Sequence, residues 1–261
     1  MEVKDSIMYH VNKDVMKSTL VKGTRYDDRD FEAFRPISVQ KSVISTAEGS
    51  AVANVGETSV MVAVKFDVLK PFPDRPTEGV MMMNAELLPT ASPEFEPGPP
   101  NENSIELARV VDRGLRSAEI VDVKKFFIEE DKVLGMFLDI YVLNNAGNMT
   151  DTASIAASAA LLDTKLPKIE GAAIVRGEYT GPLNPRVLPI STTLAKVGDC
   201  WLVDPTRDEE RVQETSISIA TTDEHVCSMQ KRNGAITKEE LLDNIDIAFK
   251  TGNDIRKLLT R

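Results

Sequence analysis

The sequence lacks the features that mark several classes of protein. It has only two cysteines and two histidines in 261 residues, and no apolar run approaches the ~18 residues of a membrane-spanning helix. Its start, MEVKDSIMYH, has neither the basic nor the apolar stretch of a signal peptide. The cysteines give no disulfide framework, and the histidines are not spaced like zinc ligands. We therefore expect a cytoplasmic protein with no membrane span, cofactor or metal site. His225 and Cys227, which could share one strand face, are interpreted as a core pair.

The charge balance excludes a further class. The formal net charge is -10 and the pI is close to 4.9, whereas proteins that bind nucleic acid on their own usually carry a net basic field. Any contact with an anion must therefore be local, or depend on a partner that supplies positive charge. With 42% hydrophobic and 28% charged residues, the chain is expected to be globular.

Residues 101–122 predict one amphipathic helix with an arginine face. At ~100° per residue, three arginines fall within about 60° of one another. They are Arg109, Arg113 and Arg116, and they lie opposite an apolar side of Leu107, Val110, Val111, Gly114, Leu115 and Ala118. Guanidiniums on one rigid face are suited to gripping successive phosphates or carboxylates. Glu106 and Asp112 lie three or four residues from these arginines, so a solvated face with intrahelical ion pairs fits equally well.

The rest of the chain alternates between β-rich and helical patterns. Helices are expected at residues 4–20, where Ile7, Met8, Val11 and Val15 have helical spacing, at 152–163, and after the capping box of Thr237 and Glu240. Strands are expected at 38–46, 50–55, 58–68, 79–88, 124–129 and 133–143, and later at 190–198, 200–203, 216–222 and 225–231. Strands followed by helices, twice over, indicate an α+β protein with a pseudo-repeat.

Several motifs occur in a fixed order and together resemble a known family. They are KGTRYDDRDFEAFRPI (22–37), EGSAVANVGETSVMVAV (48–64), SPEFEPGPP (92–100), IELARVVDRGLR (105–116), AGNMTDTASIAASAALLD (146–163) and WLVDPTRDEE (201–210). In this order they resemble the subunits of RNase PH-type phosphorolytic exoribonucleases over nearly the whole chain. SPEFEPGPP, LVDPT and VCSMQKRNG are similar in detail to the non-catalytic ring subunit of the archaeal exosome.

The resemblance implies a fold, partners and a ligand. The fold would be α+β and RNase PH-like, with two βαβ-type halves of mixed sheets and packed helices. The chain would stand beside a catalytic RNase PH-like paralogue in a hetero-hexameric ring that threads RNA, with RNA-binding cap subunits as further candidate partners. We assign residues 1–30 to an N-terminal helix and extended segment, 31–167 to the first half, and 186–261 to the second half with its C-terminal helix.

One position departs sharply from the pattern of active members. Their phosphate is expected at the loop and N-terminus of the helix after Leu143, where free N–H groups and the helix dipole favour an anion. Active enzymes resembling this chain carry an arginine just before the Thr-Ala of that helix, and this sequence has Asp151. A carboxylate facing the site would repel phosphate.

Other departures point the same way. Residues 101–103 are Asn-Glu-Asn, where active subunits carry an arginine pair, and the glycine-rich strand end expected near the active site is SMQKRNG at 228–234. At the carboxylate motif Asp204 is kept, but Glu210 stands in the second place. This retention is ambiguous, because residues 204–210 also fit an ordinary acidic loop.

The sequence thus predicts a non-catalytic subunit of the archaeal exosome ring. It would bind RNA and support a catalytic partner in 3′-to-5′ phosphorolytic RNA degradation, with RNA contacts at Arg109, Arg113 and Arg116. Asp151, Asp204 and Glu210 would be degenerate active-site positions. Two alternatives stay open: an active phosphorolytic exoribonuclease subunit using Asp204 and Glu210, and a purely structural ring protein without RNA contacts.

Overall fold

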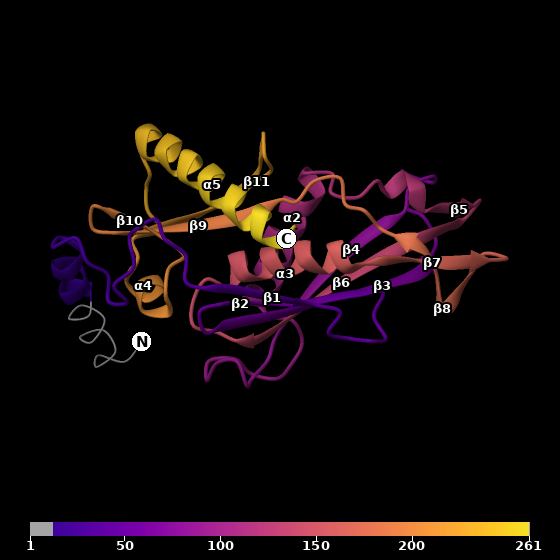
Figure 1. The fold of residues 1–261 in the computed structure, drawn as a ribbon, viewed down its shortest axis with the longest axis horizontal. Helices are drawn as coiled ribbons and strands as arrows, with labels where there is room; N and C mark the ends of the chain where they lie inside the picture. Colours follow the sequence, from indigo (N-terminus) through magenta and orange to yellow (C-terminus); the bar gives the residue numbers. More distant parts are fainter. Residues whose placement is uncertain (1–12, 261) are drawn as a thin grey trace.

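Two β-sheets with one helix between them form the framework of the protein (Figure 1). A computed structural model describes residues 13–260, and its elements confirm the expected α+β class. The strands are β1 (Ile37–Lys41), β2 (Gly49–Val55), β3 (Thr58–Leu69), β4 (Val80–Leu87), β5 (Phe127–Glu129), β6 (Lys132–Asn144), β7 (Lys165–Glu170), β8 (Ala173–Pro182), β9 (Ile190–Val197), β10 (Cys200–Val203), β11 (Thr215–Thr221) and β12 (Val226–Arg232). The helices are α2 (Glu102–Ser117), η1 (Val123–Phe126), α3 (Met149–Asp163), α4 (Arg207–Val212) and α5 (Lys238–Leu259).

The first sheet has the order β1-β2-β3-β6-β4, with β5 paired to β6. Its first three strands form an antiparallel meander where the sequence predicts three strands, and β2 turns into β3 at Gly56, whose φ of 56° suits glycine. β4 pairs in parallel with β6, so that β4, α2 and β6 form a crossover unit. Of the strand expected at 124–129, only β5 is extended, because the residues before it form the 3-10 turn η1.

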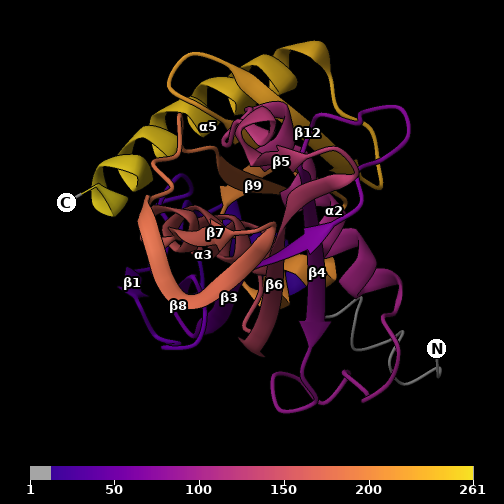
Figure 2. The same ribbon diagram turned by 90° about the vertical axis from the view of Figure 1, so that its right-hand side faces the viewer.

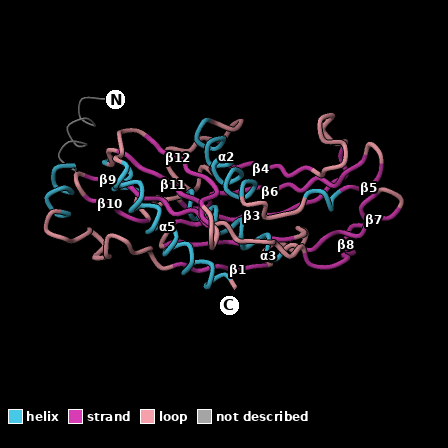
Figure 3. The backbone as a smooth tube through the Cα atoms, turned by 90° about the horizontal axis from the view of Figure 1, so that it is seen from above, coloured by secondary structure: helices cyan, strands magenta, loops and turns pink. Residues whose placement is uncertain are grey.

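The second sheet is antiparallel throughout, in the order β10-β9-β11-β12. Helix α5 begins at the expected capping box and covers the outer side of this sheet (Figure 2). The apolar seam between them includes Leu194, Ile217, Ile219 and Ala248. Helix α2 lies beside the edge strand β4 of one sheet and the edge strand β12 of the other (Figure 3).

Helix α3 is buried between the two sheets. It packs against β2 and β3 with its alanines, and it faces β9 through small polar side chains such as Ser154, whose Oγ accepts a hydrogen bond from the backbone N–H of Ser191. The sequence predicted this helix at residues 152–163, and it begins three residues earlier. The helix is buried on all sides, so its small polar side chains face another strand and not solvent.

The N-terminal helix packs on a face other than the expected one. Its described part spans residues 13–20, and Ile7, Met8 and Val11 lie outside the described residues. Val15 is 50% exposed, whereas Met16 and Leu20 are buried in a cluster with residues of the second half. The apolar spacing therefore predicted the helix, but the side that packs against the protein lies about one residue, or ~100°, from the side that carries Val15.

The expected core pair of His225 and Cys227 is wrong. The His225 side chain is 80% exposed in the turn between β11 and β12, and Cys227 is half-buried. His225 precedes the strand, so the alternation of strand faces does not apply to it. None of the helices between residues 13 and 260 combines the length and apolar character that a bilayer crossing requires.

Gly49→Ala should weaken the packing of α3 on β2. An added Cβ would lie 2.2 Å from Oγ1 of Thr164 and 2.7 Å from the carbonyl oxygen of Ala160, so the helix would have to shift. We expect the free energy of unfolding, measured with urea, to fall by ~2 kcal/mol. Gly98→Ala is the control, because nothing lies within 4 Å of its added Cβ. Equal losses in the two variants would contradict this account.

Candidate functional site

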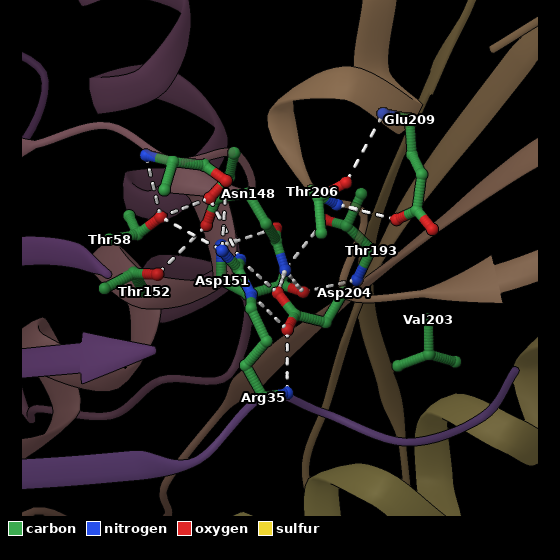
Figure 4. A network of polar contacts seen from close by, with 12 residues as sticks. Arg35, Thr58, Asn148, Asp151, Thr152, Thr193, Val203, Asp204, Thr206 and Glu209 are labelled. Carbon is green, nitrogen blue, oxygen red and sulfur yellow. Dashed lines mark hydrogen bonds and ion pairs between the residues drawn. The ribbon is translucent and has the colours of Figure 1, made fainter. Parts of the chain in front are cut away.

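A buried ion pair joins the segment before β1 to the end of β10. The carboxylate of Asp204 accepts hydrogen bonds from Nε and Nη2 of Arg35, each at 2.7 Å, and from Nη1 of Arg29 at 3.0 Å (Figure 4). Asp204 is fully buried. Arg35 also donates to the carbonyl oxygens of Ala146 and Gly147, in the loop that leads into α3. Asp204 and Arg35 therefore hold together the segment before β1, the loop before α3 and the end of β10.

The three suspected active-site positions do come together, around Asn148. This residue is the N-cap of α3 and has a left-handed backbone. Its Nδ2 donates to both Asp151 and Asp204 at 2.8 Å, and its backbone N–H donates to Oε1 of Glu210 at 2.8 Å. The helix end expected to bind phosphate is therefore met by a carboxylate of the same chain.

Asp151 does not face an open phosphate site as expected. It is fully buried, and its oxygens accept hydrogen bonds from the backbone N–H of Thr193 at 2.6 Å and from its Oγ1 at 2.7 Å. Burial raises the pKa of Asp151 to about 7, although bonds from Asn148 and Thr193 oppose the shift. The side chain turns inward because β9 offers two donors there, which sequence spacing does not reveal.

The acidic residues after Asp204 are not a simple solvated loop. Glu209 is buried, and its carboxylate accepts a bidentate pair of hydrogen bonds from Nε and Nη2 of Arg25, at 2.9 and 2.6 Å. Asp208 is exposed. Burial raises the pKa of Glu210, whereas its bond from Asn148 and the charges of Arg232, Arg35 and Arg207 lower it. Among residues 13–260, no group of three or more His, Cys, Asp or Glu side chains is placed to hold a metal ion.

Helix α2 carries the second candidate region. Its apolar side is buried as predicted, and all three arginines are exposed. Arg116 binds the carboxylate of Asp112 and the carbonyl oxygen of Met81, each at 2.8 Å. Arg113 donates to Oε1 of Gln230 at 3.2 Å. No hydrogen bond or ion pair within the described residues engages the side chain of Arg109. The three arginines are thus unequal, a difference that helical spacing cannot show.

The start of α2 is not basic. Asn101 is the N-cap of the helix, accepting a hydrogen bond from the backbone N–H of Ser104 at 2.9 Å. A pocket of about 260 Å³ adjoins this end, and its charged lining residues are Glu86, Glu96 and Asp139. The described lining holds no basic side chain, so the missing arginine pair is not replaced from elsewhere in this part of the chain.

Sequence reasoning missed several residues that build the junction. Arg35, Asn148 and Thr193 hold the carboxylates. The sequence offered one signal for Arg35, because this residue lies in the motif KGTRYDDRDFEAFRPI (22–37) on which the family resemblance rests. Its partner lies 169 positions away, beyond the reach of local spacing.

Comparisons with known proteins agree on one family. A model described as "3′ exoribonuclease family, domain 1" matches residues 33–167, and one described as "3′ exoribonuclease family, domain 2" matches residues 188–251. Exosome complex component Rrp42 of Thermococcus kodakarensis is 45% identical, over 98% of this chain and 96% of that protein. Rrp42 of Archaeoglobus fulgidus is 44% identical, over 97% of each.

Solved structures give the same result. A chain from the Archaeoglobus fulgidus exosome with RNA bound to the active site matches with a TM-score of 0.88 and 44% identity, over 96% of this chain and 98% of that one. A chain of an archaeal exosome core matches with a TM-score of 0.86 and 39% identity, over 99% of this chain and 100% of that one.

The buried carboxyl of Asp151 should make stability depend on pH. Its pKa of about 7 in the folded state lies above the ordinary 3.8, so between these values the folded chain holds more protons than the unfolded chain. Stability should therefore fall as the pH rises from about 4 to 7 and level off above. Asp151→Asn removes this dependence.

We expect the free energy of unfolding of wild type to drop by roughly 2 kcal/mol more than that of Asp151→Asn between pH 5 and pH 8. Urea titrations of both proteins at the two pH values measure this difference, and other titrating groups cancel in it. Parallel pH profiles would show that Asp151 is already ionised at pH 5.

Proposed function

Because the chain belongs to the 3′ exoribonuclease family of RNase PH type, we propose that it is a non-catalytic subunit of the archaeal exosome ring. The RNase PH-like fold expected from the sequence is confirmed by this membership. In the proposed role the chain binds RNA and supports the active site of a catalytic paralogue that degrades RNA by phosphorolysis from the 3′ end.

One observation carries the non-catalytic part of the proposal. The N-terminus of α3, where a phosphate would be attracted, is occupied by the chain's own Glu210, with Asp151 and Asp204 on the same Asn148. An incoming phosphate would meet carboxylate where it needs N–H groups and cations. The two retained carboxylates are also engaged elsewhere: Asp204 holds Arg35 and Arg29, and Glu210 caps Asn148.

The arginine face of α2 supports the RNA-binding part. Arg109 has no partner within the described residues, and Arg113 is held only by a neutral amide, so both guanidiniums can take phosphate oxygens. Arg116 already has a carboxylate and a carbonyl partner. We therefore propose that Arg109 and Arg113 supply most of the grip and Arg116 little.

The proposed partners follow from relatives. An archaeal exosome with RNA bound to the active site contains a chain similar to this one, which supports a ring with a catalytic paralogue and with RNA. RNA-binding cap subunits are proposed as further partners. We also propose a cytoplasmic location, which agrees with two unpaired cysteines, Cys200 and Cys227.

Phosphate-dependent decay of RNA tests the division of labour. The purified chain alone should release no nucleoside diphosphates from RNA with inorganic phosphate, because its own anion site is filled. A mixture with the catalytic paralogue should be more active than the paralogue alone. Turnover by the isolated chain would overturn the non-catalytic assignment and favour an active enzyme that uses Asp204 and Glu210.

Arg109→Ala with Arg113→Ala should weaken binding of single-stranded RNA by the assembled ring. We expect a loss of roughly 10-fold or more, since each charged hydrogen bond contributes about 1.5–3 kcal/mol before compensation. The slope of log affinity against log salt should fall by about 1.4, because two contacts to single-stranded phosphates are lost. Fluorescence anisotropy across a salt series measures both quantities.

Arg116→Ala is the matched control for that double variant. It removes a guanidinium from the same face, but one that is already bound to Asp112. The affinity for RNA should therefore change by no more than about 2-fold, and the slope of log affinity against log salt by no more than about 0.3. Unchanged RNA binding in the double variant would support the purely structural alternative instead.

A further inference from the structure

Two of the three acidic residues of α2, Glu106 and Asp112, are engaged away from the gripping arginines. Asp112 is bound by Arg116, one turn further along the helix, at 2.8 Å. Glu106 is bound by Nε of Arg232 on β12, at 3.0 Å. These are the two carboxylates of α2 that lie three residues from Arg109, a spacing at which they could otherwise have neutralised it.

The pairing of Glu106 decides the state of Arg109. Glu106 lies three residues before Arg109, a spacing at which side chains on a helix meet and ion pairs form. Without a competitor, this carboxylate would occupy Arg109 and place a negative charge beside any bound phosphate. The ion pair with Arg232 on β12 keeps Glu106 away from Arg109.

Strand β12 contacts α2 with alternate side chains. Gln230 and Arg232 point toward the helix, while Lys231 between them bonds to the carbonyl oxygens of Asn233 and Gly234. These residues belong to the strand end that departs from the glycine-rich pattern of active members. The departure supplies side chains that a glycine-rich strand end would lack.

We propose that Arg232 and Gln230 are positioning residues for the RNA grip, Arg232 by sequestering Glu106 from Arg109 and Gln230 by holding Arg113 with a neutral acceptor. This inference rests on the proposed RNA-binding function. The end of β12, which departs from the pattern of active members, would thereby keep the guanidiniums of Arg109 and Arg113 unpaired with carboxylates and available to phosphate. Neither positioning residue needs to touch RNA itself.

The expected effect is modest, because the Arg232–Glu106 pair lies at the surface. Its side chains are 47% and 37% exposed, and exposed pairs contribute only up to ~1 kcal/mol. Loss of Arg232 should therefore weaken RNA binding by about 2- to 5-fold at low salt. Screening should reduce the effect as salt rises.

A double-mutant cycle on Arg232→Gln and Glu106→Gln in the assembled ring tests the proposal, with binding of a single-stranded oligoribonucleotide as the readout. Arg232→Gln alone should weaken binding, Glu106→Gln alone should change it by less than about 2-fold, and the double variant should recover wild-type affinity. The double variant keeps the net charge of wild type, so recovery reports the local pairing.

Two further variants sharpen the cycle. Lys257→Gln with Asp254→Gln removes an exposed ion pair from α5 and should leave binding unchanged, which controls for loss of a surface pair as such. Gln230→Glu should weaken binding by about 2- to 5-fold, because a carboxylate would then neutralise Arg113. Thermal unfolding of each ring confirms that the subunit is folded.

Several results would overturn the inference. If Arg232→Gln leaves affinity unchanged, Glu106 does not compete for Arg109. If it weakens binding and Glu106→Gln does not restore it, Arg232 contacts RNA directly. The proposed function fails separately, through an unchanged affinity of the Arg109→Ala, Arg113→Ala ring.

Discussion

The buried pair of Asp204 and Arg35 is the interaction on which the rest of the structure depends. It brings together the segment before the first sheet, the loop before α3 and the end of β10, which are far apart in sequence. Removing one partner of such a pair leaves an uncompensated buried charge, typically at a cost of about 3–5 kcal/mol. The same pair withdraws Asp204 from chemistry, since both carboxylate oxygens are already bound. Structural anchoring and the proposed loss of catalysis would thus share one physical cause.

Around this pair, the chain's own carboxylates satisfy the neighbouring hydrogen-bond donors. Glu210 takes the backbone N–H at the start of α3, and Asp151 takes the two donors of Thr193. Buried polar groups must be hydrogen-bonded, so filling the site from within gives a junction that needs no ligand to be complete. A filled site also explains how α3 can lie between two sheets with every side covered.

Local pattern predicted the fold well where local physics decides it. The meander, the apolar side of α2 and the capping box of α5 each follow from periodicity or from a cap within a few residues. The N-cap of α2 is Asn101, although Asn103 and Ser104 are also good cap residues, because tertiary context selects among them. Met16 replaced Val15 on the packing face for the same reason. The inward turn of Asp151 could not be predicted, since it depends on Thr193, 42 residues away.

The arginine face shows how an acidic protein can still present a usable cation. With a net charge of -10, most arginines are expected to find carboxylates, and Arg25, Arg35 and Arg116 do. A free guanidinium therefore requires that nearby acids be engaged by other cations. On α2 this is achieved by geometry: Asp112 is bound one turn on, and Glu106 is bound across to β12. An unpaired guanidinium at Arg109 is thus a property of two elements packed side by side, because in α2 taken alone Glu106 would be free to pair with it.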